Sequence, residues 1–209
     1  MKVLYFDTET TGLRAEGFVQ DGVMHPGKIC QLAYVIEEDG ALSARNYYFA
    51  VDAIEAGASA VTGLTVPEVA RLSGGHRFEE YVDEFLPDFA TADRIVAHNL
   101  SFDERFMQAE CARLGLRFYT GEHGFCTMRA FTPIMRLPGK GGRYKFPSLA
   151  EFARFYEVSD EEVMTVMRSL FDAEKGAHDA RHDVVKMYLA LDRACRYDLQ
   201  LAAMFGKLG

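Results

Sequence analysis

Residues 3–13 read VLYFDTETTGL, in which an apolar run leads directly into two acidic residues. Val3 to Phe6 form an unbroken apolar stretch, which is typical of a strand that is buried on both faces. Asp7 and Glu9 follow two positions apart, so they point to the same side if the extended chain continues past Asp7. Two carboxylates on one side repel each other unless a cation lies between them. The pair is therefore either a solvated strand end or half of a metal site.

Outward from this stretch, the sequence alternates between strand-like and helical patterns. Residues 29–36 and 44–51 read as two further strands, and Asp39-Gly40 between them is a strong hairpin signal, so the chain begins with a three-stranded meander. Residues 94–97 read as another buried strand, while 14–28 and 138–147 read as loops. Helices are predicted over 78–90, where Pro87 would disturb the end, and over 149–156, 160–174 and 178–195. One more helix is predicted after the strand at 94–97, with Ser101 and Glu104 as its cap and Gly115 at its end. This order predicts a single α/β domain over residues 1–209, with a mixed sheet flanked by helices.

Composition limits the classes of protein to which the chain can belong. The net charge of −8 argues against a protein that coats nucleic acid over a large surface, but it does not exclude an enzyme that holds one end of a strand. No apolar run is long enough to cross a membrane. The four cysteines are scattered without a CxxC pair, which is typical of reduced thiols in a cytoplasmic protein.

A second polar cluster follows the strand at 94–97, in the sequence AHNLSFD (97–103). Asn99 comes just past the strand end, where loops of α/β sheets often carry function. Asp103 falls in the first turn of the predicted helix, where the helix dipole favours an anion. Asp103 is therefore either a dipole-complementing acid or a site residue, and Asn99 is either a turn residue or a site residue.

A third cluster is HDARHDVV, residues 178–185. His178 and Asp183 would not share a helix face, because five positions correspond to about 140° of rotation, but they converge if His178 precedes the helix. His178 and His182 lie one turn apart and resemble half of a zinc site, yet no third ligand completes it, so His182 is predicted to be a surface residue. Asp179 is predicted to be a helix-start acid and is the main rival to Asp183 for the site.

The three clusters together supply four carboxylates and one histidine. Oxygen-only ligands suit Mg²⁺ or Mn²⁺. A carboxylate set of this kind is what a two-metal phosphodiesterase site needs. The histidine is suited to take a proton from an attacking water near neutral pH. The predicted catalytic and metal-binding residues are Asp7, Glu9, Asp103, Asp183 and, as the base, His178.

These motifs, in this order along nearly the whole chain, resemble the DnaQ-like DEDDh 3′–5′ exonucleases. That superfamily includes polymerase proofreading subunits, ribonuclease T and the TREX-type nucleases. The resemblance implies a ribonuclease H-like fold, two divalent ions and release of nucleoside 5′-monophosphates. By the same resemblance, Asp7, Glu9 and Asp183 would hold the first ion, Asp7 would bridge to the second with Asp103 nearby through water, and His178 would be the general base.

The resemblance also implies a set of residues that contact the substrate, the 3′ end of single-stranded DNA or RNA. Leu64, in VTGLT (61–65), would wedge between terminal bases, and Phe102 would stack on a base; core packing is the alternative for both. Gln31 replaces a glutamate that is frequent in the family and is predicted to be structural. The expected substrate-binding residues are Thr10, Gly12, Leu13, Leu64, Asn99 and Phe102.

Segments outside the motifs could reshape access to the site, so the motifs do not identify the substrate or the partners. The 14–28 loop and the 159–177 stretch, the latter an insertion before the last motif, look longer than the family needs. The loop at 138–147 carries Lys140, Arg143 and Lys145, which would either follow a phosphate backbone or form a solvated surface. A polymerase or a second copy of the chain remains an open partner.

Two other functions are consistent with parts of the pattern. A catalytically silent nucleic-acid-binding module could keep the fold, although all four carboxylates and His178 are present. An apolar strand that ends in DTET also resembles the aspartyl phosphatases of the haloacid dehalogenase type. Those enzymes have Asp rather than Glu as the second acid, and the AHNLSFD cluster is unlike their pattern.

Overall fold

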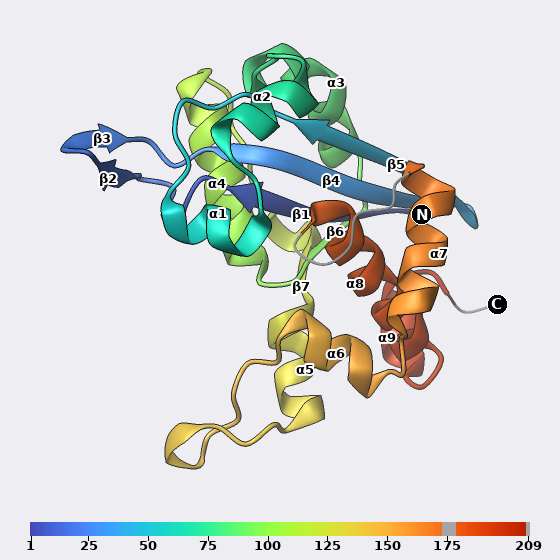
Figure 1. The fold of residues 1–209 in the computed structure, drawn as a ribbon. Coiled ribbons are helices and arrows are strands. Elements are labelled where there is room, and N and C mark those ends of the chain that lie inside the picture. The colour runs from blue at the N-terminus through green and yellow to red at the C-terminus, as the bar shows by residue number, and fades with distance from the viewer. Residues whose placement is uncertain (173–178, 208–209) are drawn as a thin grey trace.

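A five-stranded mixed sheet lies at the centre of the molecule (Figure 1). The computed structural model describes residues 1–172 and 179–207. The strands lie in the order β5-β4-β1-β6-β7, with β1 antiparallel to β4 and parallel to β6. Their bounds are β1 (Lys2–Thr10), β4 (Ile29–Glu38), β5 (Ala41–Tyr48), β6 (Arg94–Ala97) and β7 (Gly124–Cys126). The predicted meander is confirmed, and β1 continues past Asp7 to its end at Thr10.

Helices cover both faces of this sheet (Figure 1). One core joins the sheet to α3 and α4, and a second joins its other face to α5, α6, α7, α8 and α9. The helices are α1 (Ala56–Thr62), α2 (Val66–Ser73), α3 (Phe78–Ala90), α4 (Leu100–Arg113), α5 (Thr127–Met135), α6 (Leu149–Phe155), α7 (Asp160–Phe171), α8 (Ala180–Cys195) and α9 (Leu199–Met204). None of the helices in the described part of the chain has the length and apolar character needed to cross a bilayer.

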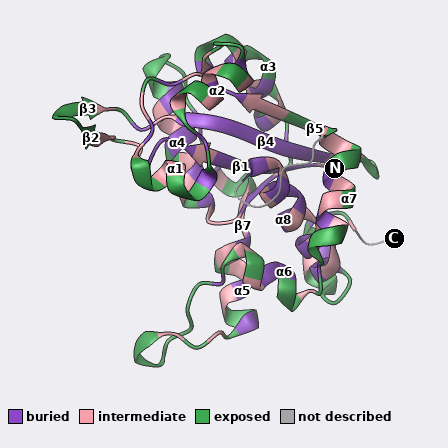
Figure 2. Cartoon of the chain, viewed as in Figure 1, coloured by how far each residue is buried: buried purple, intermediate pink, exposed green. Residues whose placement is uncertain are grey.

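Alternate residues of β1 pack into the two different cores. Val3 and Tyr5 belong to the core that contains α8, while Leu4 and Phe6 belong to the core that contains α3 and α4. The central strands are accordingly buried along most of their length (Figure 2). Because strand side chains alternate, the residues that follow Tyr5 at the same spacing also point to the α8 side.

Two predicted interruptions of secondary structure are wrong. The predicted loop at 14–28 contains a hairpin, β2 (Phe18–Gln20) and β3 (Val23–His25), whose turn is formed by Asp21 and Gly22 with positive φ. That dipeptide is the same hairpin signal that joins β4 to β5. Pro87 does not disturb α3, which continues to Ala90 because Phe85 and Phe89 on either side of it are held in the core.

The predicted cap of α4 is also wrong. The helix begins at Leu100, directly after Asn99, whose φ is 71°, so Ser101 lies inside the first turn. Glu104 does not return to the cap. Its Oε1 accepts hydrogen bonds from the backbone N (2.9 Å) and Oγ1 (2.8 Å) of Thr120. The end of this helix agrees with the prediction, since Gly115 follows it with a positive φ.

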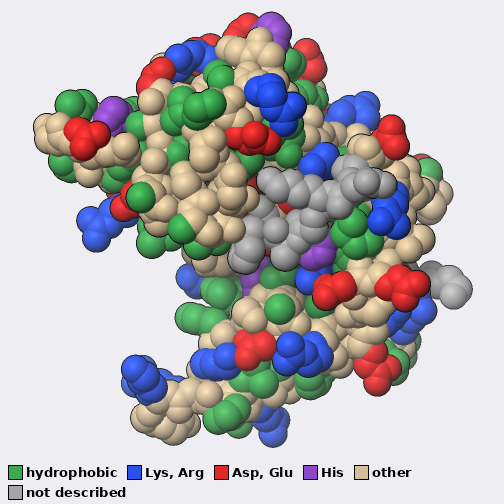
Figure 3. Space-filling view, in the orientation of Figure 1, with side chains coloured by type: hydrophobic (Ala, Val, Ile, Leu, Met, Phe, Trp, Pro, Cys, Tyr) green, Lys and Arg blue, Asp and Glu red, His purple; other side chains and the backbone are tan. Residues whose placement is uncertain are grey.

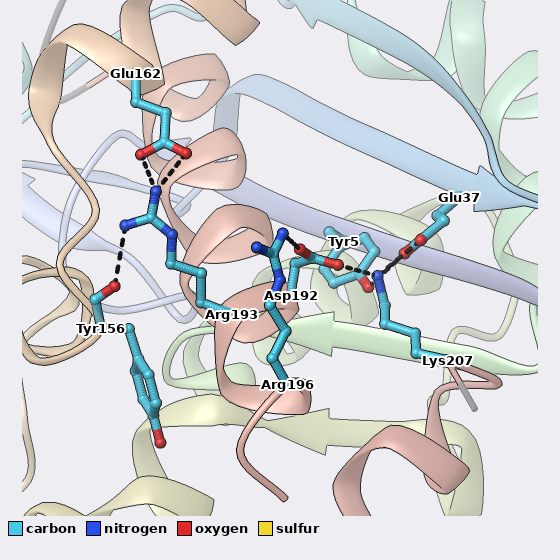
Figure 4. Close-up of polar contacts among 8 residues, drawn as sticks. All are labelled: Tyr5, Glu37, Tyr156, Glu162, Asp192, Arg193, Arg196 and Lys207. Atoms are coloured by element: carbon cyan, nitrogen blue, oxygen red, sulfur yellow. Dashed lines mark hydrogen bonds and ion pairs between the residues drawn. The ribbon is translucent and has the colours of Figure 1, made fainter. Parts of the chain in front are cut away.

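Charged side chains fix the C-terminal part of α8 (Figure 4). Arg193 donates to both carboxylate oxygens of Glu162 (2.7 and 2.5 Å) and to the backbone oxygen of Tyr156 (3.1 Å). Lys207 lies 2.7 Å from oxygens of both Glu37 and Asp192, and so ties the segment after α9 to β4 and α8. These contacts hold α8 against its neighbours at the end farthest from Asp183.

Candidate active site

Three predicted metal ligands meet where β1 ends and α8 begins. One carboxylate oxygen from each of Asp7, Glu9 and Asp183 lies within 4.8 Å of the others. Asp7 and Glu9 continue the row of Val3 and Tyr5, which faces α8. The prediction that this pair shares one side is therefore confirmed, and Asp183 is the acid that joins it.

The start of α8 is fixed by a buried polar cluster around Asp179. Asp179 accepts hydrogen bonds from the backbone N (3.1 Å) and guanidinium (2.6 and 2.9 Å) of Arg181 and from Nε2 of Gln31 (2.9 Å). Burial alone would raise the pKa of Asp179, but the bonds from Arg181 and Gln31 hold it below its ordinary value. Asp179 is thus the N-cap of α8 and positions Asp183 one turn later, and Gln31 is structural, as predicted.

Asp103 reaches the site from the opposite layer, in the first turn of α4. Its Oδ1 accepts hydrogen bonds from the backbone N (3.1 Å) and Oγ1 (2.7 Å) of Thr8. Burial raises the pKa of Asp103 to about 7, against the opposing effect of the bonds from Thr8. Sequence reasoning missed Thr8, although its place between Asp7 and Glu9 directs its side chain to the α4 face.

The electrostatics of Asp7 favour a cation. Burial raises the pKa of Asp7, and the nearby charges of Asp103, Asp183 and Glu9 raise it further. Within the described ranges, no lysine or arginine forms an ion pair with Asp7. A divalent cation would relieve this repulsion, and an oxygen-only donor set suits a hard ion. The residues therefore fit a divalent metal.

The third motif carries two histidines, His178 and His182. His178, the predicted base, lies outside the described residues. His182 is only 3% exposed, with Nδ1 3.1 Å from Oδ1 of Asp183, so its prediction as a surface residue is wrong. The prediction failed because α7 packs over α8 and leaves it little free surface.

His98 lies beside the site and was not predicted. It directly follows β6, and its Nε2 lies 3.0 Å from the backbone oxygen of Pro147, while Nδ1 lies 2.9 Å from Oγ1 of Thr127. Burial lowers the pKa of His98, although its hydrogen bond to Pro147 and the charge of Asp183 act in the opposite direction. With both ring nitrogens bonded to protein atoms, His98 joins the end of β6 to the segment before α6.

Four of the predicted substrate-binding residues line one cavity beside Glu9. The cavity has a volume of about 310 Å³, within the range of small-ligand sites. Its wall consists of Thr8, Glu9, Thr10, Gly12, Leu13, Glu55, Gly57, Ala58, Val61, Thr62 and Phe102. Thr10 also donates from Oγ1 to the backbone oxygen of Gly12 (2.8 Å), which shapes the chain there.

Asn99 and Leu64 do not line this cavity. Leu64 is 1% exposed and packs with Cys30, Val51 and Val69, so core packing is correct and the expected wedge is not present. Its neighbour Val61 does line the cavity and is 57% exposed. Asn99 lies at the start of α4, where its Oδ1 accepts a long hydrogen bond from Ser101 (3.4 Å).

Comparison with known proteins agrees with this geometry. The profile of the RNase T exonuclease family matches residues 4–191, a range that contains every acidic residue of the site. No curated protein matches the chain. The divalent-metal dependence of the family accords with the cluster of Asp7, Glu9 and Asp183, and its ribonuclease H-like fold accords with the mixed sheet. The chain belongs to the RNase T exonuclease family of metal-dependent nucleases.

Proposed function

We propose that this chain is a 3′–5′ exonuclease of the DEDDh type. It removes nucleoside 5′-monophosphates one at a time from the 3′ end of single-stranded DNA or RNA. The observation that supports this most is the convergence of Asp7, Glu9 and Asp183, whose oxygens lie within 4.8 Å of one another. Asp103, held beside them by Thr8, supplies the fourth carboxylate.

The proposed cofactor is a pair of Mg²⁺ or Mn²⁺ ions. Asp7, Glu9 and Asp183 would hold the ions, with Asp103 contributing from nearby. When bound, such ions stabilise charge on the phosphodiester and lower the pKa of the attacking water.

The remaining steps are assigned to the chain's own residues. His178 takes the proton of the attacking water, a role that suits a group with an ordinary pKa near neutrality. In the sequence it directly precedes Asp179, the cap of α8. Thr8 keeps Asp103 oriented by donating two hydrogen bonds to one carboxylate oxygen.

The cavity beside Glu9 is the proposed site of the terminal nucleotide. Leu13, Phe102 and Val61 offer apolar surface to a base, while Thr8, Glu9 and Thr10 supply polar groups to the same wall. An added Cβ at Gly12 would lie 2.9 Å from Oε2 of Glu55, so the end of the Glu55 side chain would have to move if another residue took this position.

Hydrolysis of end-labelled strands tests the proposal. Single-stranded DNA and RNA of one sequence, labelled at the 5′ end, are incubated with Mg²⁺ or Mn²⁺, with and without chelator. We expect a chelator-sensitive ladder that shortens from the 3′ end, with none for Asp183→Asn. The faster of the two substrates identifies the preferred nucleic acid.

Other outcomes would favour other functions. Binding without cleavage would support a catalytically silent module of the same fold. Immediate release of the labelled 5′-terminal nucleotide, without a ladder, would contradict the proposed direction. The family match leaves the haloacid dehalogenase alternative without support.

A further inference from the structure

The segment between α5 and α6 forms a small hairpin, here called the basic hairpin (residues 137–146). Pro138 pairs with Tyr144 in an antiparallel bridge, and the backbone N of Gly139 donates to the oxygen of Arg143 (2.9 Å). The N of Lys145 donates to the oxygen of Leu137 (3.0 Å). A Cβ at Gly139 would lie 2.6 Å from the oxygen of Arg143, so the strands approach too closely for any other residue. The predicted loop at 138–147 is thus a defined structure.

The basic hairpin presents free cations and bare aromatic rings together. Lys140 and Arg143 are exposed and enter no ion pair within the described part of the chain, whereas Lys145 pairs with Glu151 (2.5 Å). Tyr144 and Phe146 are 51% and 59% exposed. Blue side chains gather on this protrusion in the space-filling view (Figure 3). In a chain of net charge −8, such a patch suits a polyanion with flat, apolar faces.

The base of the basic hairpin is attached to the edge of the sheet that carries the acids. Pro147, which follows the hairpin, accepts the hydrogen bond of His98. The parallel register pairs Tyr5 of β1 with Val96 of β6, so two residues later His98 is level with Asp7. The hairpin and the β2–β3 arm project to the same side of the molecule (Figure 1), and the surface between them is hollowed (Figure 3).

We propose that the basic hairpin binds the single strand that leads into the active site. Lys140 and Arg143 contact phosphates upstream of the scissile bond, and Tyr144 and Phe146 stack on unpaired bases. This inference rests on the proposed function and adds to it a binding site for the strand upstream of the 3′ end. Arg143 lies four residues before Pro147, and its backbone N donates to the oxygen of Lys140 (3.4 Å) across the turn, so the extended chain carries both cations roughly 13 Å from Pro147. At about 3.4 Å per stacked nucleotide this equals about four nucleotides.

Strand length provides the sharpest test of this proposal. The variant Lys140→Gln/Arg143→Gln is compared with the wild-type chain on strands of 3 and 20 nucleotides. For the longer strand we expect KM to rise about tenfold and the slope of log KM against log salt to flatten by about 1.4, since each lost phosphate contact accounts for about 0.7. For the trinucleotide, which is too short to reach the hairpin, the change should be less than twofold.

Two further variants separate charge from stacking. Arg45→Gln/Arg117→Gln removes the same charge from exposed, unpaired positions elsewhere on the described surface and should leave both lengths unaffected. Tyr144→Ala/Phe146→Ala should raise KM about tenfold for the single strand, as expected for a lost stacking contact, and much less for a blunt duplex. Equal effects of the Lys140/Arg143 variant on both lengths, or none on either, would overturn the proposal.

Binding in chelator distinguishes failure of this proposal from failure of the exonuclease proposal. Fluorescence anisotropy of the labelled 20-nucleotide strand is measured for the same variants without metal. Hairpin-dependent binding without any cleavage by the wild-type chain would overturn the exonuclease proposal alone. Cleavage by the wild-type chain, with binding equal in all variants, would overturn the hairpin proposal alone.

Discussion

Three consecutive residues of β1 serve two opposite layers of the molecule. Asp7 and Glu9 point toward α8 and meet Asp183, while Thr8 points toward α4 and holds Asp103. Period-two alternation of a strand produces this division without any bend in the chain. The acids can therefore be gathered from both layers only at the end of the strand, where neither layer covers it completely.

Removing one facing carboxylate should separate activity from stability. We expect Asp7→Asn to lower hydrolysis by at least about a hundredfold, since a metal ligand is lost. In chelator its Tm should rise by about 2–4 °C, as relief of about 1 kcal/mol of repulsion would give in a chain of this size. The control Asp83→Asn, an exposed acid on α3, should change neither quantity. Full metal-dependent activity of Asp7→Asn would contradict the assignment of Asp7 as a metal ligand.

The raised pKa of Asp103 gives a prediction for stability against pH. The folded chain keeps the proton of Asp103 up to about pH 7, whereas the unfolded chain releases it near 3.8. Between these values the unfolded state binds fewer protons, so this group lowers the free energy of unfolding as pH rises. Asp103→Asn removes that contribution.

Denaturant unfolding in chelator at intervals from pH 4 to pH 8 measures this effect. The stability of Asp103→Asn relative to the wild-type chain should increase across the window from about 4 to 7 and then level off. Carboxyls with lowered pKa values, such as Asp179 and Asp192, act at lower pH and equally in both proteins. Parallel stability curves over the whole range would contradict the assignment.

Local pattern was sufficient to identify the acids of the site but not the burial of their neighbours. Asp7, Glu9 and Asp183 could be predicted because strand alternation and motif order are written in short stretches of sequence. Whether Leu64 and His182 are exposed depends on which elements pack over them, α2 and α7 respectively, and no local pattern contains that information. The position of His178 remains a prediction, since it lies outside the described residues.

At the scale of elements, α8 is held at both of its ends. Asp179 and Gln31 fix its first turn, and Arg193 and Lys207 fix its last turns (Figure 4). Asp183 lies one turn from the first of these anchors. The position of this metal ligand is thus set by the rigid helix and not by a loop, which suits a site that needs fixed geometry.

Loss of the α8 cap should therefore affect both stability and catalysis. We expect Asp179→Ala to cost about 3 kcal/mol, because it leaves the partly buried Arg181 without its partner. Activity should fall about tenfold or more as the first turn of α8 loosens around Asp183. Chemical denaturation and hydrolysis assays measure the two effects.

The cap of α9 provides the matched control. Asp198 accepts hydrogen bonds from the backbone N of Gln200 (2.9 Å) and Leu201 (3.0 Å), but it is exposed and distant from the acids. Asp198→Ala should cost about 1 kcal/mol and leave activity unchanged. If both variants were equally active, the Asp179 cluster would have only a general stabilising role.

Local signals in the sequence made some helices and strands predictable, while others were missed. The helices α3 and α6 and the strand β4 match their predicted positions closely, because periodicity and capping residues mark them. The strand β5 begins and ends three residues earlier than the predicted 44–51. The helices α1 and α2 were not predicted, although α6 is as short as α1. Thr65 and Glu68 at the start of α2 have the same spacing as the capping pair of α6 and could have signalled it. The β2–β3 hairpin was missed even though Asp21-Gly22 signals it, since its strands are three residues each.

At the scale of the whole molecule, the sheet combines local and distant pairings. The meander of β1, β4 and β5 was predictable because consecutive strands are joined by short connections. The parallel partner of β1 is β6, which begins only at Arg94, after three helices. Such a crossover pairing leaves no mark in the sequence of either strand, and the order β5-β4-β1-β6-β7 could therefore not be predicted.

This arrangement implies an order of events during folding. Loop closure costs more entropy as the separation between partners grows, so we expect the local meander to form before β6 pairs and before α8 docks. Asp7 and Glu9 would then be in place early, while Asp183 arrives with one of the last elements of the chain.

This order can be measured by refolding the chain from denaturant in the presence of Tb³⁺, a luminescent substitute for a divalent ion. Far-UV circular dichroism should recover first, and tyrosine-sensitised terbium luminescence should appear only in the slowest phase. Luminescence that develops together with the first secondary structure would contradict it. With the expected order, ion binding is the last property that the chain acquires, and a partly folded molecule carries no working nuclease.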